Sequence, residues 1–243
     1  MRTLTFAKRT AKEILRDPLN LCFGLGFPLV LLFLLSIIQS NIPVSLFEID
    51  HLAPGITVFG LSFLTLFSAT IISKDRSSAL LQRLYTTPMS PADFILGYTL
   101  PIIPIAIAQG LVCYLAAWVL GLKPTVNILY ALAGNIPVAV FYIALGLLFG
   151  SMLNEKQVGG ICGALLTNLS AWLSGIWFDL DLVGGVFRKI AYALPFVHAV
   201  ELERMLLAGD YAASLNHLWW VLSYAIAVLT AAVLMFLRQM KKQ

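Results

Sequence analysis

The residues that do chemistry in other proteins are few here, and their spacing matches no common catalytic motif. Phosphate binding by a P-loop needs G-x-x-x-x-G-K-[ST], and the sequence has no Gly-Lys pair. The patterns HExxH, GxSxG and CxxC are also missing, which argues against the hydrolytic, zinc and redox sites that they mark. Cys22, Cys113 and Cys162 all fall in apolar stretches, so we expect no disulfide framework. We predict that the chain is not an enzyme and has no catalytic residue and no metal site.

Three histidines and the five acids of residues 179–217 are the remaining candidates for a metal or cation site. The histidines are His51, His198 and His217, and the acids are Asp179, Asp181, Glu201, Glu203 and Asp210. The histidines would share a metal only by an accident of folding. The acids could attract cations, but we interpret them as solvated polar faces.

Three polar side chains lie deep in apolar stretches, namely Gln109, Asn135 and Asn168. They either hydrogen-bond between helices or touch a passing substrate. Carriers that run on ion gradients usually keep an ionisable side chain at such a depth, and none is present here. If this chain pumps, its energy must therefore enter through a partner.

The elements that must position these residues are predicted to be membrane-spanning helices. The chain has 243 residues, of which 60% are apolar and only 12% are charged, about half the charged fraction of a soluble domain. Six uncharged stretches are long enough to cross a bilayer: residues 20–40, 52–73, 94–120, 128–153, 157–178 and 218–237. The uncharged run after the basic N-terminus is too long for a signal peptide, so we expect a retained anchor. Nucleic-acid binding is disfavoured because the basic residues flank apolar runs.

Two pairs of glycines, Gly146/Gly150 and Gly159/Gly163, have the small-xxx-small spacing that lets membrane helices approach closely. The sequence leaves open whether they pack within the chain or across a dimer.

The distribution of Lys and Arg predicts the orientation. With a cytoplasmic N-terminus, twelve of the sixteen lie in inner segments and four in outer segments. Because inner segments carry the excess of positive charge, both termini are predicted to be cytoplasmic.

The N-terminal segment, residues 1–17, is predicted to form an amphipathic helix along the inner membrane face, although a plain positive-inside tag remains an alternative. At helical spacing its apolar side chains gather on one side and its cations on the other. The apolar set is Leu4, Ala7, Ala11, Ile14 and Leu15, and the cationic set is Arg2, Lys8, Arg9, Lys12 and Arg16.

Residues 74–93 are predicted to form a short docking helix between two spans. After Lys74-Asp75-Arg76, the residues Leu80, Leu81, Leu84 and Tyr85 recur at helical spacing, and Thr87-Pro88 ends the helix. Ser90 and Asp93 then form the N-cap of the next helix, with Pro91 in its first position. On the outer side, the long connection 179–217 holds an uncharged run around Pro195. That run is too short to span, which predicts a re-entrant piece among small helices.

With these features in hand, the chain resembles the membrane subunits of type-2 ABC transporters over its whole length. Two motifs carry the resemblance. The first runs from Lys74-Asp75-Arg76 through Leu80 and Leu84 to Thr87-Pro88. The second runs from Leu194-Pro195-Phe196 through Glu201 and Arg204 to Gly209. The family often has a glutamate and a glycine where Asp75 and Ser77-Ser78 stand here.

The resemblance implies one all-α transmembrane domain over residues 1–243. Its parts are an interfacial helix (1–17), spans one and two (18–73), a cytoplasmic coupling segment (74–93), spans three to five (94–178), an outer re-entrant segment (179–217), and span six with a cytoplasmic tail (218–243). It also implies a second six-span permease, identical or not, and a separate ATPase that binds ATP and Mg²⁺, while this chain binds no cofactor.

In that arrangement the ATPase would push on eight coupling residues: Lys74, Asp75, Arg76, Leu80, Arg83, Leu84, Thr87 and Pro88. Spans two and five would line the path, with Thr65, Ser68, Asn168 and Trp172 as lining residues. An apolar path implies a hydrophobic or amphipathic cargo such as a drug, lipid or peptide, exported across a bacterial cell membrane. The alternatives are a carrier or channel that works without ATP, and a membrane anchor or sensor that transports nothing.

Overall fold

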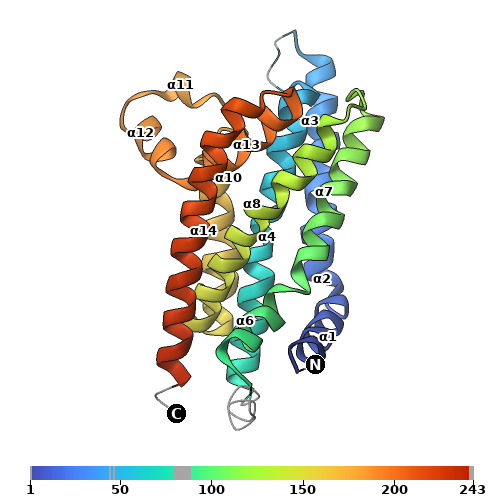
Figure 1. The fold of residues 1–243 in the computed structure, drawn as a ribbon. Coiled ribbons are helices and arrows are strands. Elements are labelled where there is room, and N and C mark those ends of the chain that lie inside the picture. Colours follow the sequence, from blue (N-terminus) through green and yellow to red (C-terminus); the bar gives the residue numbers. More distant parts are fainter. Residues whose placement is uncertain (1, 44, 46, 79–88, 241–243) are drawn as a thin grey trace.

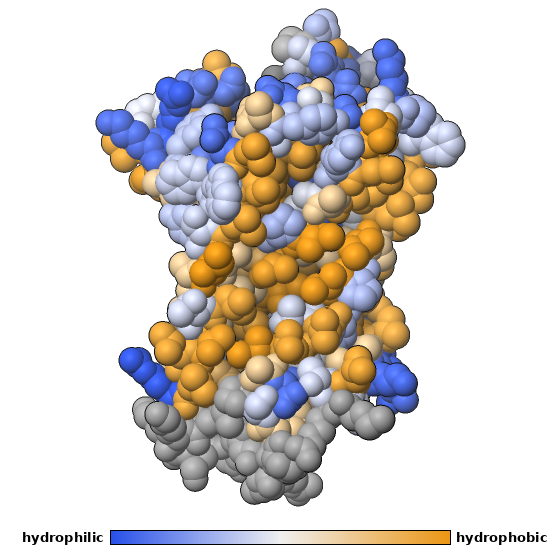
Figure 2. All heavy atoms as spheres, viewed as in Figure 1, coloured by the Kyte–Doolittle hydropathy of each residue, from blue (hydrophilic) through white to orange (hydrophobic). Residues whose placement is uncertain are grey.

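The computed structural model describes residues 2–43, 45, 47–78 and 89–240, and these residues form a bundle of long helices. The N- and C-terminal ends lie at the same end of the bundle, and α11 (Leu180–Val183), α12 (Gly185–Ala193) and α13 (Pro195–Ala208) lie toward the opposite end (Figure 1). Figure 2 shows a broad band of apolar side chains across the middle of the visible face, with hydrophilic side chains gathered toward the end that carries α11 and α12. This distribution suits a protein surrounded by lipid.

Five helices of the described residues are long and apolar enough to cross a membrane: Cys22–Asn41, Ile49–Ser77, Ala92–Val119, Asn127–Met152 and Tyr211–Arg238. They correspond to the predicted spans one, two, three, four and six. The first joins the π-helical stretch η1 (Cys22–Gly26) to α3 (Phe27–Asn41), after the short α2 (Pro18–Leu21). The third joins α6 (Pro91–Thr99) to α7 (Ile102–Val119), with a turn next to Pro101.

The predicted fifth span, residues 157–178, is not among these five helices. The chain there forms α9 (Glu155–Val158), the π-helical η2 (Gly159–Leu166) and α10 (Thr167–Trp172) in immediate succession. This run ends at Trp172, six residues before the predicted end, and the chain turns at Gly175, which has a φ of 71°. Glu155, Lys156 and Gln157 make the start of the run polar.

Helix α4 (Ile49–Ser77) is the central element. It packs against α8 (Asn127–Met152), α7, α13, α3 and the α9–η2–α10 run. In its apolar 18-residue stretch, 89% of the residues are buried within this single chain. The corresponding values for the α3 segment and for α14 (Tyr211–Met240) are 22% each. Because α3 and α14 are apolar yet exposed, their outward faces suit contact with lipid or with another membrane subunit.

Two glycines allow the close contact between α4 and α8. A Cβ on Gly146 would lie 2.3 Å from the Cβ of Ser68, and one on Gly150 would lie 2.8 Å from the Cα of Ala69. Thr65 adds a hydrogen bond from its Oγ1 to the carbonyl oxygen of Tyr142, 2.8 Å away. The first glycine pair therefore packs within the chain, which answers the question that the spacing left open.

Candidate functional site

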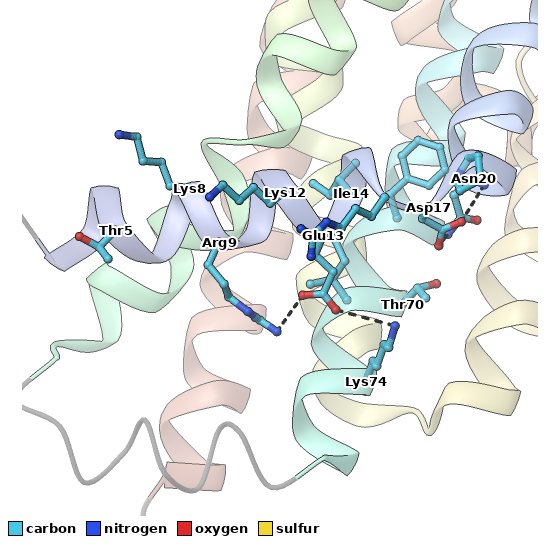
Figure 3. Close-up of a pocket in the computed structure, with 14 residues that line it drawn as sticks. Thr5, Lys8, Arg9, Lys12, Glu13, Ile14, Asp17, Asn20, Thr70 and Lys74 are labelled. Atoms are coloured by element: carbon cyan, nitrogen blue, oxygen red, sulfur yellow. Dashed lines mark hydrogen bonds and ion pairs between the residues drawn. The ribbon is translucent and has the colours of Figure 1, made fainter.

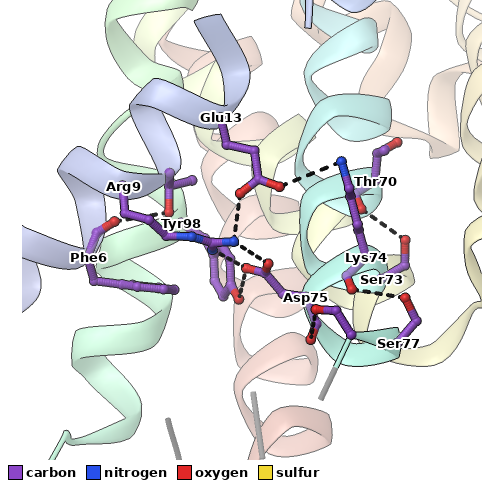
Figure 4. A network of polar contacts seen from close by, with 11 residues as sticks. Phe6, Arg9, Glu13, Thr70, Ser73, Lys74, Asp75, Ser77 and Tyr98 are labelled. Atoms are coloured by element: carbon purple, nitrogen blue, oxygen red, sulfur yellow. Dashed lines mark hydrogen bonds and ion pairs between the residues drawn. The ribbon is translucent and has the colours of Figure 1, made fainter. Parts of the chain in front are cut away.

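The most developed polar site is a clamp between Arg9, Asp75 and Tyr98 at the end of the bundle that holds the termini (Figure 4). Asp75, near the end of α4, is 1% exposed. Arg9 of α1 (Arg2–Leu15) donates from Nη2 to Oδ1 at 2.6 Å and from Nη1 to Oδ2 at 2.5 Å. The Tyr98 hydroxyl of α6 donates to Oδ2 at 2.9 Å. One buried carboxylate thus joins three helices through charge-assisted hydrogen bonds.

Two further charged residues surround the clamp. Glu13 accepts from Arg9 at 2.7 Å on one turn of α1, and its other oxygen lies 3.8 Å from the Nζ of Lys74. The hydrogen bond to Asp75 raises the pKa of Arg9 above its ordinary value, although partial burial acts in the opposite direction. The guanidinium therefore stays charged at any physiological pH.

Aromatic packing fixes α1 against α6 beside the clamp. The Phe6 ring lies 4.9 Å from the Tyr98 ring and 5.8 Å from the Phe94 ring, both edge to face. A Cβ on Gly97 would lie 2.1 Å from Cδ1 of Phe6, so this contact requires glycine there. The predicted N-cap of α6 is confirmed: Ser90 and Asp93 form a reciprocal capping box, and Asp93 also accepts a hydrogen bond from Thr3.

Arg76 points to a different partner. Its Nη2 donates to the carbonyl oxygen of Leu153 at 2.6 Å, and its Nη1 donates to that of Ser151. These carbonyls belong to the end of α8, where a helix leaves acceptors unpaired. The consecutive charges Lys74, Asp75 and Arg76 therefore bind α4 to both α1 and α8 within this chain.

The other predicted coupling residues lie outside the described residues, namely Leu80, Arg83, Leu84, Thr87 and Pro88. The described part of the N-terminal segment differs from the simple two-sided helix that the sequence predicted. Ala7 and Ile14 are buried against the protein, whereas Leu4 and Leu15 are 66% and 68% exposed. The apolar residues of α1 therefore divide between a surface that packs against the protein and a surface that is exposed.

The four residues predicted to line a path fall into two groups. Thr65 and Ser68 are buried in the contact between α4 and α8. Asn168 and Trp172 are exposed on α10, where the Asn168 amide donates to the carbonyl oxygen of Ala164 at 2.7 Å. Only the α10 pair lies on the surface of this chain.

A second polar cluster lies between α7, α8 and α13, and it corrects one interpretation. Glu203 is fully buried rather than solvated, and the Tyr114 hydroxyl donates to its Oε2 at 2.9 Å. Burial raises the pKa of Glu203 well above its ordinary value and so favours the neutral form of the side chain. Gln109 donates from Nε2 to the carbonyl oxygen of Thr57 at 3.2 Å, so it links α7 to α4. Asn135 is also buried.

Two of the three histidines meet at the opposite end of the bundle. The Nδ1 atoms of His198 and His217 are 2.9 Å apart, and His198 stacks on Trp220 at 4.7 Å. The Nε2 of His198 lies 3.0 Å from the carbonyl oxygen of Tyr192, so it carries the proton and Nδ1 accepts from His217. Among the described residues, no three His, Cys, Asp or Glu side chains are grouped to hold a metal ion.

Sequence reasoning missed Arg9 and Tyr98 as the partners of Asp75. The position of Asp75 carried a signal, because it follows Ser68, Ile71 and Ile72 on one face of α4. That face is buried, and a carboxylate on it needs a cation.

Comparison with known families agrees with this architecture. The model of a family described as ABC-2 type transporter matches residues 1–207, which include α1, the clamp and nearly all of α13. No curated protein matches the chain. Since the match covers most of the sequence, the chain belongs to the ABC-2 type transporter family, as a multi-pass membrane permease component.

Proposed function

We propose that the chain is the permease subunit of an ATP-driven exporter in a bacterial cell membrane, with both termini in the cytoplasm. It forms the path for a hydrophobic or amphipathic cargo together with a second six-span permease. A separate ATPase subunit binds ATP and Mg²⁺ and supplies the energy. The α9–η2–α10 run serves as the fifth of the six spans in this proposal.

The clamp of Arg9, Asp75 and Tyr98 is the observation that carries the proposal. It fastens α1, which has a cationic side, to the last turns of α4, the most enclosed of the five long helices. A displacement of α1 or of the segment after Ser77 is therefore passed directly to α4. Transport components driven from outside need such a rigid link, because coupling travels through packed elements with discrete arrangements.

The contact with the ATPase is assigned to the segment that follows the clamp. Lys74 is 58% exposed in its side chain and stands at the end of α4. Leu80, Arg83, Leu84, Thr87 and Pro88 follow it and provide the docking surface in this proposal. Asp75 and Arg76 transmit the movement to α1 and α8.

The exposed side chains of α10 are the first candidates for cargo contact. Asn168 and Trp172 present an amide and an aromatic ring on an otherwise apolar surface. Thr65 and Ser68 would reach cargo only in a state in which the α4–α8 contact opens.

A second candidate function, a carrier that works without ATP, is favoured by Glu203. Buried acids of this kind take up and release protons in carriers. Burial favours its neutral form and Tyr114 holds it by a hydrogen bond, whereas the clamp of Arg9, Asp75 and Tyr98 joins three helices, so ATP-driven transport is the better supported function.

Reconstitution distinguishes the two. The permease is placed in liposomes with the ATPase subunit that co-purifies with it, and efflux of an amphipathic dye and of a labelled phospholipid is measured with and without ATP. We expect ATP-dependent transport that Leu84→Asp and Arg83→Glu abolish while ATP hydrolysis continues, and that Lys123→Gln leaves intact. Equal flux without nucleotide, abolished by Glu203→Gln, would instead establish the carrier.

A further inference from the structure

A large cleft lies between α1 and the lower half of α4, beside the clamp (Figure 3). Its volume is about 830 Å³, which is within the range of small-molecule binding sites. Figure 3 shows α1 crossing α4, with Arg9 and Glu13 pointing toward Lys74 and with Lys8 and Lys12 pointing away from it. The cleft therefore has an inner side fixed by ion pairs and an outer side of free side chains.

The lining is strongly cationic. It contains five cations, Lys8, Arg9, Lys12, Arg16 and Lys74, against two carboxylates. Both carboxylates are already engaged, since Glu13 pairs with Arg9 and Lys74 and Asp17 accepts from the Asn20 amide at 2.7 Å.

Three of the cations remain available. Lys8, Lys12 and Arg16 form no ion pair with any residue that the structure describes. Three unpaired cations on successive turns of one helix can donate charge-assisted hydrogen bonds to a phosphate group.

The cleft also has an apolar side. Phe67 and Ile71 of α4 and Ile14 of α1 form part of its wall. Leu4 and Leu15 lie within one sector of α1 next to Lys8, and both are exposed.

Exposed apolar residues continue away from the cleft along the first span. Phe23 and Val30 follow shortly after Asn20, which lines the cleft, and they are 47% and 61% exposed. A ligand with a phosphate at one end and hydrocarbon at the other fits a cationic cleft that continues into an exposed apolar surface.

We propose that the cleft binds the headgroup of an anionic phospholipid from the inner leaflet. Lys8, Lys12 and Arg16 hold the phosphate, and the acyl chains run past Phe67 and along the exposed face of η1 and α3. Basic residues at a membrane surface each strengthen the binding of anionic lipid. Since Arg9 anchors the same helix to Asp75, a bound lipid would hold α1 in its clamped position.

Native mass spectrometry of the full chain in neutral detergent tests this inference. The probes are palmitoyl-oleoyl phosphatidylglycerol, the matching phosphatidylcholine, and inorganic phosphate. We expect phosphatidylglycerol to bind at least tenfold more tightly than phosphatidylcholine, and inorganic phosphate at millimolar concentration to displace neither. The triple variant K8Q/K12Q/R16Q should lose this preference by at least tenfold.

The matched control removes the same charge elsewhere. In K123Q/K156Q/K189Q all three substituted lysines are exposed and none lines the cleft, so the preference should persist. Equal loss in both triple variants would overturn the site, and so would displacement by inorganic phosphate. A photocrosslinker at position 12 that joins two copies would show that the cleft is an interface between permeases and would also overturn it. None of these measurements uses the ATPase, so the outcome is independent of the proposed transport function.

Discussion

Arg9 and Asp75 form a two-point ion pair although 66 residues separate them, and this pair fixes the first helix of the chain to the end of the central one. The pair is asymmetric, since the Asp75 side chain is 2% exposed and that of Arg9 is 37% exposed. Burial of the Asp75 carboxylate therefore depends on the charge of Arg9, whereas Arg9 is also stabilised by water. The attachment of α1 at this end of the bundle therefore depends on Asp75.

Replacement of Asp75 by Asn should release α1. The variant leaves Arg9 without its buried partner, at a cost of about 2 kcal/mol, less than for a fully buried pair because Arg9 is partly solvated. Hydrogen exchange over residues 2–15 should then accelerate about thirtyfold.

Lys74→Gln is the control for that experiment. It removes only a 3.8 Å contact of an exposed lysine, so the free energy of opening of α1 measured by hydrogen exchange should change by less than about 1 kcal/mol. If the two variants exchange at equal rates, Asp75 does not anchor α1.

Replacement of Gly150 by Ala should weaken the packing of α8 on α4. The added Cβ would meet the Ala69 backbone at 2.8 and 2.9 Å, and backbone cannot move aside as a flexible side chain can. We expect a loss of about 1–3 kcal/mol, measured as a lower unfolding temperature in detergent.

Gly159→Ala provides the comparison, because nothing lies within 4 Å of the position of its Cβ. This variant should keep or slightly raise the unfolding temperature, since alanine favours a helix. A decrease equal to that of Gly150→Ala would contradict the packing explanation.

Helices α12 and α13 should loosen on acidification because of His198. Burial lowers the pKa of His198 below its ordinary value of 6.5, so the unfolded chain takes up a proton more readily than the folded one. The contribution of neutral His198 to stability is therefore complete above about pH 6.5 and decreases as the pH falls below it. The protection factors over residues 185–208, corrected for the intrinsic pH dependence of amide exchange, should fall as the pH is lowered from 7.5 to 5.5.

Two variants check the assignment of this pH effect. His198→Asn should reduce the pH dependence of these protection factors, and the part that remains is expected from His217, whose Nδ1 lies 2.9 Å from that of His198. The same change at the exposed His51 should leave the pH dependence as it is. An undiminished pH dependence in His198→Asn would place the titrating group elsewhere.

Glu203 should tolerate replacement by Gln. Because burial raises its pKa well above the ordinary value, the neutral acid is favoured in the folded protein, and the amide oxygen of Gln can accept from Tyr114 in its place. We expect a change within about 1 kcal/mol for Glu203→Gln and a loss of about 2–4 kcal/mol for Glu203→Ala. Thermal unfolding measures both, and equal losses would mean that the carboxylate is ionised.

The parts of the fold that depend on local pattern were predictable from the sequence. Five of the predicted spans coincide with long apolar helices, and the capping box at Ser90 and Asp93 is present as expected. These features follow from hydrocarbon thickness and from the amides left unpaired at a helix start, which involve neighbouring residues only.

The fifth span and the polar contacts depend on packing between distant segments, and the sequence did not reveal them. The run that ends at Trp172 begins with Glu155 and Lys156, so its polar start and its length do not distinguish a span from a shorter helix. Glu203 resembled a solvated acid because Tyr114, its partner, lies 89 residues away. The outward position of Leu4 and Leu15 likewise depends on α6 occupying the adjacent face of α1.

The distance in sequence between Arg9 and Asp75 also sets the order of folding steps during synthesis of the protein. Arg9 leaves the ribosome long before its carboxylate exists, and Tyr98 is made later still. The first helix must therefore wait, unfastened, until two spans have entered the membrane and the third has begun. The attachment of α1 therefore follows the insertion of α4 and α6 with Asp75 and Tyr98 on the same side of the membrane as α1.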